Sequence, residues 1–326
     1  MCAVLAAYAA RIDAHDPLSG LEVGERPSPT KHPGWTTVQV KAAGLNHHDV
    51  WSLKGVGLPA DRLPMILGCD GAGVAADGTE VIVHAVVPSD GWTGDETLDP
   101  RRTLLSELHD GTLAEQVAVP AANVVAKPEG MPWETAACLS TAWLTAYRML
   151  FTNSGVQPGG TVLVQGAGGG VATALVQLGS VAGYRMWVTS RDEAKGARAV
   201  ELGADRAFES GARLPEKVDA VMETVGAATW THSINCLRPG GTVVICGATS
   251  GDAPPKAELT KIYFRQLRVI GSTMGNRTEL ERLARFVADR GIQPVVDSVH
   301  SLADARAGFT RIVDGEVFGK VVISVG

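Results

Sequence analysis

A glycine-rich loop carries the clearest chemistry in this chain. Val162–Gln165 has the apolar pattern of a buried strand, and Ala167, Gly169 and Ala172 follow it in the spacing A-x-G-x-x-A, a small-residue form of G-x-G-x-x-G/A. Such a loop lets phosphate oxygens reach backbone N–H groups at the start of a helix, where the dipole favours negative charge. A glycine turn that binds nothing is the alternative. The pattern indicates a dinucleotide pyrophosphate site at Gly168, Gly169, Gly170 and Val171.

The residues after the next predicted strand decide which dinucleotide fits. Met186–Thr189 is this strand, roughly 20 residues beyond the glycines, where NAD-binding folds place an acidic residue on the ribose 2′-hydroxyl. Ser190, Arg191 and Lys195 stand there instead. A hydroxyl and two cations would hold a 2′-phosphate through charge-assisted hydrogen bonds, so the sequence favours NADPH over NADH. A helix start whose basic residues only face solvent is the alternative.

Length and composition restrict the classes of protein. With 326 residues, 45% of them apolar, the chain can form two domains with packed cores. A net charge of −6 with scattered basic residues argues against nucleic acid or a membrane surface as the main partner. The five cysteines form no C-x-x-C pair, which suits reduced thiols in the cytoplasm. The apolar start, Cys2–Ala10, lacks a preceding basic segment and is predicted to be a strand rather than a signal peptide.

The first part of the chain has the pattern of an irregular β domain. Residues 1 to about 128 contain short β-like runs broken by Gly and Pro. The predicted strands are Val38–Ala43, Gly71–Ala75, Glu80–Val87 and Ala114–Val119. Near the other end of the chain, Pro294–Val299 and Gly319–Val325 return to β character. We expect these terminal runs to rejoin the first domain, because chain ends often pair across a domain.

The middle of the chain alternates strands and helices. A helical pattern over Thr135–Leu150 comes first. The predicted strands are Val162–Gln165, Met186–Thr189, Ala220–Glu223, Val243–Cys246 and Arg268–Ser272, and helices are expected to begin near Gly170, Asp192, Ala227, Glu258 and Thr278. This alternation predicts an α/β domain with a doubly wound parallel sheet, whose ligand binds at the carboxyl ends of the strands.

Several short stretches, in their order and spacing, go beyond fold class. They are Ala43–Asp49, Leu67–Val74, Asp110–Val117, Leu144–Tyr147, the glycine loop, Leu202–Ala204, Pro239–Gly241 and Phe318–Val321. Over essentially its full length the chain resembles the medium-chain dehydrogenase/reductase superfamily, in particular its zinc-free quinone oxidoreductase and enoyl-reductase-like branch. The resemblance implies a GroES-like substrate domain of residues 1–128 and 295–326, and a Rossmann domain of residues 129–294. It also implies a homodimer paired through the strand near Val269 and Ile270.

The positions that hold zinc in metal-dependent members of this family have changed. Asn46 and Thr141 stand where those members have cysteines, and Cys69 stands where they have a histidine. One soft ligand cannot hold a tetrahedral zinc, so we expect no catalytic metal. A displaced site, formed by a histidine of the His47–His48 pair with Cys69 and Asp70, is the alternative.

Without a metal, the chemistry that remains is hydride transfer to an activated acceptor. Alkoxide formation at neutral pH depends on a metal, whereas a quinone or an α,β-unsaturated carbonyl spreads the arriving charge onto an oxygen that hydrogen bonds stabilise. The resemblance places Asn46, Trp51 and Thr145 near the nicotinamide. We expect the Asn46 amide to donate to the acceptor oxygen, unless it only caps a turn, and Trp51 to shape the pocket. Water can supply the proton, so neither His47 nor His48 is expected to be essential.

Strand ends and loops are expected to line the cofactor groove and the substrate pocket. Beyond the two phosphate sites, the cofactor residues are Thr224, Val225, Gly247, Ala248, Thr273, Met274, Phe318 and Lys320. Met274 and Phe318 are equally consistent with a plain core. Residues 54–63 and 89–108 would set substrate choice by their shape, and no cysteine between Val87 and His109 is present for a structural zinc. Two other functions stay open: a zinc-dependent alcohol or aldehyde dehydrogenase with a displaced metal, and a non-catalytic NADPH-binding sensor or structural protein.

Overall fold

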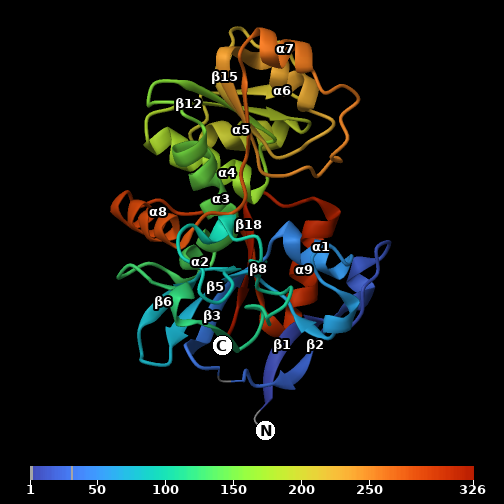
Figure 1. The fold of residues 1–326 in the computed structure, drawn as a ribbon, viewed down its shortest axis with the longest axis vertical. Helices are drawn as coiled ribbons and strands as arrows, with labels where there is room; N and C mark the ends of the chain where they lie inside the picture. The colour runs from blue at the N-terminus through green and yellow to red at the C-terminus, as the bar shows by residue number, and fades with distance from the viewer. Residues whose placement is uncertain (1–2, 31) are drawn as a thin grey trace. The chain divides into compact units, whose positions relative to one another are not determined.

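The computed structural model describes residues 3–30 and 32–326, and the chain forms two compact units (Figure 1). One unit comprises Met1–Ala142 and Gly275–Gly326, and the other comprises Trp143–Met274. The domain borders expected from the sequence, near residues 128 and 295, differ from these limits and stay a prediction about how the chain divides into folding units.

The first unit is built on a mainly antiparallel sheet in the order β10-β6-β5-β3-β18-β17, with β9 also paired to β3. Its strands, with those of two smaller sheets, are β1 (Ala3–Ala9), β2 (Leu21–Pro27), β3 (Trp35–Gly44), β4 (Met65–Ile66), β5 (Asp70–Ala75), β6 (Glu80–Val83), β7 (Val86–Val87), β8 (Thr103–Leu104), β9 (Gln116–Pro120), β10 (Val124–Ala126), β17 (Val296–Ser301) and β18 (Lys320–Ser324). The C-terminal strand β18 pairs antiparallel with β3. The terminal β runs therefore return to the first unit, as predicted.

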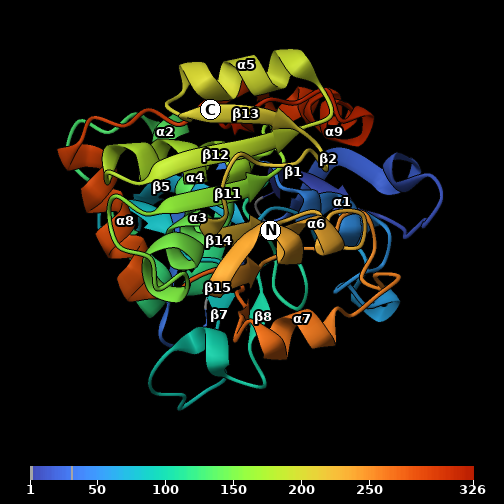
Figure 2. The same cartoon turned by 90° about the horizontal axis from the view of Figure 1, so that it is seen from above.

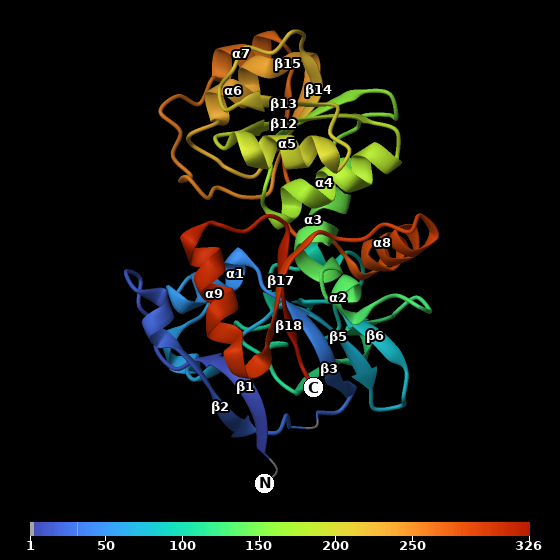
Figure 3. The same cartoon turned by 180° about the vertical axis from the view of Figure 1, so that it is seen from behind.

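Two helices close the core of this unit. Val50 and Leu53 from α1 (His47–Leu53) and Phe309 from α9 (Ala305–Asp314) pack with the inward residues of β3 and β18 in one apolar cluster, and Figure 3 shows α9 beside α1. Burying a side chain such as Phe309 contributes about 1.5 to 3 kcal/mol. The other helical elements are α2 (Trp133–Ala136), α8 (Arg277–Asp289) and the short turns η1 (Pro17–Gly20), η2 (Ala60–Arg62), η3 (Glu96–Leu98), η4 (Ala121–Asn123) and η7 (Leu302–Asp304).

The second unit contains a parallel sheet in the order β13-β12-β11-β14-β15-β16, seen from above in Figure 2. Its strands are β11 (Thr161–Gln165), β12 (Arg185–Ser190), β13 (Arg206–Glu209), β14 (Val218–Glu223), β15 (Leu237–Ile245) and β16 (Arg268–Gly271). Its α-helices are α3 (Leu144–Tyr147), α4 (Gly170–Val181), α5 (Glu193–Glu201), α6 (Trp230–Cys236) and α7 (Leu259–Phe264). The alternation of strands and helices is the doubly wound arrangement that the sequence predicts.

Local differences from the predicted elements have physical causes. Strand β13 was not predicted, because its residues are mostly exposed and lack an apolar run. The predicted strand over Glu80–Val87 is interrupted at His84, whose backbone N–H donates to Asn123 rather than to a neighbouring strand. The predicted helix over Thr135–Leu150 is broken into short pieces by the π-helical segments η5 (Leu139–Trp143) and η6 (Arg148–Asn153).

The predicted N-terminal strand is present as β1. Strand β1 begins at Ala3, and the predicted first residue of that strand, Cys2, lies outside the described residues. Within residues 3–30 and 32–326, no helix has the length and apolar character needed to cross a membrane.

Candidate active site

The first unit places Asn46 at the junction of β3 and α1. The Asn46 backbone N–H donates to Asp49 Oδ2 at 2.8 Å, and Asp49 Oδ1 accepts from the backbone N–H of Gly68 at 3.1 Å. This carboxylate therefore joins the first turn of α1 to the loop before β5. Burial raises the pKa of Asp49 to about 6. The position of Asn46 depends on a fully buried acidic side chain.

A buried network surrounds the Asn46 side chain. Lys320 Nζ lies 2.7 Å from Asp70 Oδ2 and 2.7 Å from Asn46 Oδ1, and it donates to Leu45 O at 2.8 Å. Asn46 Nδ2 donates to the same Asp70 oxygen at 2.9 Å and to Gly44 O at 3.3 Å. Both charged side chains are buried, with Lys320 2% exposed. We call this the Lys320–Asp70–Asn46 network.

This network changes two expected roles. Asn46 was expected to donate to an acceptor oxygen, but both of its amide hydrogens already have acceptors in the same unit. Lys320 was expected to contact the cofactor, but its three ammonium hydrogens are all taken by Leu45, Asn46 and Asp70. In this structure, neither group has a hydrogen free for the expected donor role. Both residues instead hold the start of α1.

A thiol, an imidazole and a carboxylate form a second cluster beside α1. His48 Nδ1 lies 3.3 Å from Cys69 Sγ, and His48 Nε2 lies 3.1 Å from Glu107 Oε1. Burial opposes a charge on His48, but Cys69 and Glu107 outweigh it and raise the pKa of His48 to about 11. Burial raises the pKa of the Cys69 thiol, which donates to Leu105 O at 3.1 Å. His48, Asp49 and Cys69 each offer one atom that could ligate a metal, and these three atoms lie within 4.8 Å of one another.

The other predicted catalytic residues are Trp51, in α1, and Thr145, in α3. Trp51 is 37% exposed, so its ring can contact a ligand. The ring centroids of His47 and Trp51 lie 6.4 Å apart. Desolvation, together with the Lys320 cation, lowers the pKa of His47. This favours a neutral imidazole beside Trp51. Thr145 belongs to the second unit and is buried in α3.

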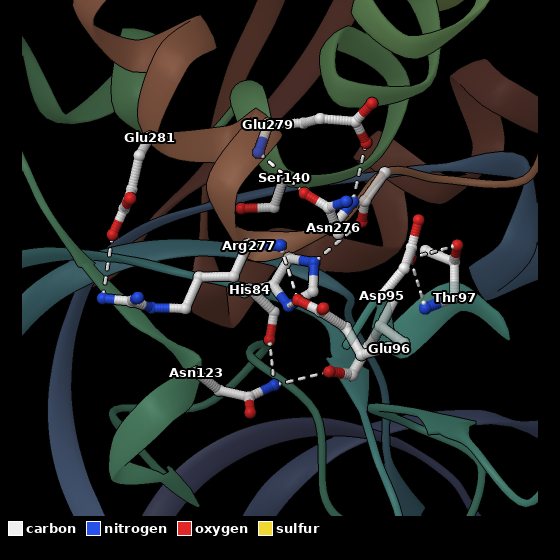
Figure 4. Close-up of polar contacts among 12 residues, drawn as sticks. His84, Asp95, Glu96, Thr97, Asn123, Ser140, Asn276, Arg277, Glu279 and Glu281 are labelled. Atoms are coloured by element: carbon white, nitrogen blue, oxygen red, sulfur yellow. Dashed lines mark hydrogen bonds and ion pairs between the residues drawn. The ribbon is translucent and has the colours of Figure 1, made fainter. Parts of the chain in front are cut away.

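The loop between β7 and β8 is tied to the start of α8 (Figure 4). Glu96 Oε1 accepts from the backbone N–H of Arg277 at 2.5 Å and lies 3.7 Å from His84 Nδ1. His84 Nε2 donates to the carbonyl of Gly275 at 2.9 Å. Part of the segment that we expect to influence substrate choice is therefore fixed by a buried imidazole and a helix start.

In the second unit, β11 leads into the predicted phosphate loop. Gly166 has φ +92°, a conformation that favours glycine. A Cβ at Gly169 would meet no atom within 4 Å, so open space lies in front of this residue. Within the described chain, α4 begins with no side-chain cap and no acidic residue in its first turn. Its first N–H groups can therefore donate to an anion, and the pyrophosphate site stays a prediction.

The predicted 2′-phosphate residues form the turn between β12 and α5. Ser190 Oγ donates to Asp192 O at 2.7 Å and accepts from Asp192 N at 3.1 Å, and Asp192 Oδ1 accepts from Lys195 N at 3.1 Å. The Ser190 hydroxyl hydrogen is therefore used within the turn. Arg191 is exposed, and no described side chain pairs with its guanidinium. Arg191 is the cation of this turn best placed to meet a ligand from solvent.

The remaining predicted cofactor residues fall into two groups. Partly or fully exposed positions at strand ends are Thr224, Val225, Gly247, Ala248 and Thr273. Met274 is 7% exposed and Phe318 is 1% exposed, so both side chains fit the core alternative better than a groove lining. The exposed positions lie at the carboxyl ends of parallel strands, where such sheets bind nucleotides.

Sequence reasoning did not single out the pairing of Lys320 with Asp70 or the buried polar residues Gln165 and Glu223. Lys320 and Asp70 are 250 residues apart along the chain, and no local pattern connects them. Gln165 and Glu223 each end an apolar run. That signal, a polar residue at the end of a buried strand, could have drawn attention to them.

Two family models and several known proteins match this chain. The alcohol dehydrogenase GroES-like domain matches residues 32–129, and the zinc-binding dehydrogenase domain matches residues 170–289. The zinc-type alcohol dehydrogenase-like protein YogA of Leptosphaeria maculans is 30% identical, with 94% of each protein covered. The acryloyl-coenzyme A reductase of Sulfurisphaera tokodaii is 26% identical, with 94% of this chain and 97% of the reductase covered.

The solved structures agree with these relatives. The crystal structure of an NAD-dependent alcohol dehydrogenase has a TM-score of 0.90 at 33% identity, covering 99% of this chain and 100% of that chain. The predicted fold, a GroES-like domain with a Rossmann domain, is confirmed. The chain therefore belongs to the medium-chain dehydrogenase/reductase superfamily.

Proposed function

We propose that this protein is an NADPH-dependent reductase that transfers hydride to a quinone or to an α,β-unsaturated carbonyl, such as an enone or an alkenal, without a catalytic zinc. The family supports an oxidoreductase as the reaction class. The Lys320–Asp70–Asn46 network is the observation that carries the finer proposal, because it engages Asn46, which by the family resemblance stands where metal-dependent members hold zinc.

The zinc implied by the family name does not suit the three positions. The Asn46 amide is engaged through both its oxygen and its nitrogen. The Cys69 thiol has a raised pKa, which disfavours the thiolate that zinc needs. Thr141 offers a neutral hydroxyl, buried and without a partner among the described residues. An ammonium 2.7 Å from Asn46 Oδ1 would also repel a dication. These observations support a zinc-free reaction.

The second unit has residues that fit NADPH. The open space at Gly169 and the uncapped first turn of α4 suit a pyrophosphate. Arg191 and Lys195 suit the 2′-phosphate because cations attract it, and the Asp192 carboxylate of the same turn is engaged by the Lys195 backbone N–H. When bound, the cofactor supplies the hydride. The strand-end residues would orient the cofactor. The turn after β12 places cations where an NAD-binding fold has an acidic residue for the ribose 2′-hydroxyl.

The acceptor is proposed from chemistry and similarity together. An acryloyl group is an α,β-unsaturated acyl group, so similarity to an acryloyl-coenzyme A reductase supports an acceptor of this kind. Negative charge that develops on its carbonyl oxygen needs hydrogen-bond donors. Since the Asn46 hydrogens are engaged, we propose that α1 offers the Trp51 indole N–H and the neutral His47 imidazole instead. Asn46 then acts by holding the start of that helix.

Steady-state oxidation of NADPH tests the proposal. Purified protein would be assayed with quinones, alkenals, enones and simple aldehydes, with NADH in parallel and with zinc content measured on the same sample. We expect turnover with the first three classes at substoichiometric zinc. Turnover of alcohols or aldehydes alone, in proportion to bound zinc, would overturn it.

One observation favours a second candidate, a dehydrogenase with a displaced metal. The ligand atoms of His48, Asp49 and Cys69 lie within 4.8 Å of one another, and Glu107 holds the other nitrogen of His48 as a second-sphere carboxylate would. A Cys69→Ser variant distinguishes the two. It would abolish activity and metal binding in a metal-dependent enzyme, and would leave the rate of a zinc-free reductase largely unchanged. Tight NADPH binding with no turnover on any acceptor would instead favour a sensor or structural protein.

We also propose a homodimer in the cytoplasm. Strand β16 lies at the edge of the parallel sheet, with Val269 43% exposed, and Tyr263 and Phe264 next to it are 69% and 79% exposed. Exposed apolar side chains beside a free strand edge favour association with a like edge. The free thiols of the described cysteines suit a reducing compartment. Light scattering of the wild type and of Phe264→Glu tests the dimer, which the added charges should dissociate.

A further inference from the structure

Three neighbouring strands of the second unit end on buried polar side chains that hydrogen bond to one another. Thr189 of β12 donates through Oγ1 to Gln165 Oε1 at 2.7 Å, and Gln165 Nε2 donates to Ser233 Oγ at 2.8 Å. Ser233 Oγ donates to Glu223 Oε2 at 2.5 Å. Each of these four side chains is fully buried. They form one continuous chain across the carboxyl ends of β12, β11 and β14, strands that lie side by side in Figure 2.

Two members of the chain, Glu223 and Thr189, also accept hydrogen bonds from loop backbone groups. The backbone N–H groups of Val225 and Gly226 both donate to Glu223 Oε1, at 2.8 and 2.9 Å. The Gly166 N–H donates to Thr189 Oγ1 at 3.3 Å, which links the glycine loop to the neighbouring strand. Thr189 directly precedes the turn that contains Ser190 and Arg191. The loops after β11 and β14 are therefore attached to the chain by hydrogen bonds, and the turn after β12 follows directly from Thr189.

Glu223 has no cation partner among the described residues, although its carboxylate is completely buried. Such a charge is tolerated because donors surround it: two backbone N–H groups, the Ser233 hydroxyl and the Thr229 hydroxyl at 2.9 Å. An apolar side chain would fill the same space without burying a charge. What the carboxylate adds is order in the loop of residues 224–226.

We propose that the chain Thr189–Gln165–Ser233–Glu223 is a positioning device for the nucleotide, which sets the phosphate loop, the 2′-phosphate turn and the loop of residues 224–226 in one fixed geometry. The inference rests on the proposed function, since it assumes that these loops bind NADPH. Preorganised donors bind a ligand without the cost of ordering them at the moment of binding. Cutting the chain should therefore weaken nucleotide binding more than it weakens the fold.

Ser233→Ala is the smallest cut, because it removes one hydroxyl between Gln165 and Glu223. Ser154→Ala is its matched control, since Ser154 is also buried in this unit and donates to Leu150 O at 2.6 Å outside the chain. We expect Ser233→Ala to raise the Kd for NADPH about tenfold and to lower the preference for NADPH over NADH. Ser154→Ala should lower the melting temperature similarly and leave both constants unchanged.

A second pair of variants separates positioning from folding. Glu223→Gln keeps one oxygen for the N–H groups of Val225 and Gly226, and its amide can donate to the hydroxyls, so we expect binding close to wild type. Glu223→Leu keeps the volume and loses the acceptors, so binding should fall. Equal Kd values for Ser233→Ala and Ser154→Ala would overturn the inference. Absence of NADPH binding by the wild-type protein would instead overturn the proposed function, which keeps the two failures distinct.

Discussion

The Lys320 ammonium lies 2.7 Å from the Asp70 carboxylate, and both side chains are buried although 250 residues separate them in sequence. The pair joins the C-terminal strand β18 to β5 and, through Asn46, to the start of α1. Buried ion pairs are sensitive to the loss of one partner, because the remaining charge is then left in a medium that solvates it poorly.

Removing one partner of this pair should destabilise the first unit strongly. We expect Lys320→Met to lower the free energy of unfolding by about 3 to 5 kcal/mol, measured by urea denaturation at neutral pH. The double variant Lys320→Met with Asp70→Asn should recover part of the loss, since no charge is then left unpaired. Lys261→Met is the control, because the Lys261 side chain, which pairs with Glu258, is 41% exposed, and its loss should have a much smaller effect. Equal losses for the two single variants would contradict a special role for the buried pair.

Stability should depend on pH through Asp49. Burial raises the pKa of its carboxyl from 3.8 to about 6, so the folded state holds a proton that the unfolded chain releases earlier. This contribution to the free energy of unfolding is fully present below the pKa of the unfolded chain, 3.8, and is lost as the pH rises through about 6. The total loss is on the order of 3 kcal/mol. Urea midpoints between these pH values should fall with rising pH in the wild type. Asp49→Asn has no proton to exchange, so its curve should lack this component, and parallel curves would exclude Asp49 as the source.

Arg191 should discriminate between the two nicotinamide cofactors. We expect Arg191→Ala to weaken NADPH binding by roughly 1.5 to 3 kcal/mol, the scale of a charge-assisted contact, and to leave NADH nearly unchanged. Titration of intrinsic fluorescence with each cofactor measures both constants. Arg206→Ala is a matched loss of charge, because Arg206 begins β13 and lies over the Trp187 ring, away from the carboxyl ends of the strands. A similar effect on NADH and NADPH would argue against a 2′-phosphate contact.

The parts of the fold that could be predicted are those with local signals. The run before the glycine loop is fully buried as β11, and α4 begins within the glycines, because strand, turn and helix each depend on neighbouring residues. The Rossmann order follows from the alternation of such units. By contrast, β13 is short and exposed and lacks an apolar pattern, so nothing in its own residues marks it as a strand.

The side-chain roles were harder to predict, because they depend on contacts between distant segments. The resemblance predicts that Asn46 is an amide at a position where metal-dependent members hold zinc. It does not reveal that Lys320 donates to the oxygen of this amide and that Asp70 accepts from its nitrogen. Pairing between polar side chains has no periodicity along a chain. The same reason hides the link between Gln165 and Glu223, which runs through Ser233 on a helix.

Gly169 offers a test that separates folding from ligand binding. Its φ is −74°, which any residue adopts, and a Cβ there would meet no atom within 4 Å. We therefore expect Gly169→Ala to keep the free energy of unfolding, while the added methyl group occupies the space that a pyrophosphate needs and raises the Kd for NADPH about tenfold or more, or about 1.4 kcal/mol. Gly166→Ala is the contrasting variant, because φ is +92° at Gly166, so it should destabilise the fold whether or not a ligand is present. Calorimetric unfolding and cofactor titration on both variants give the comparison, and unchanged NADPH affinity in Gly169→Ala would mean that the open space in front of α4 is not the phosphate site.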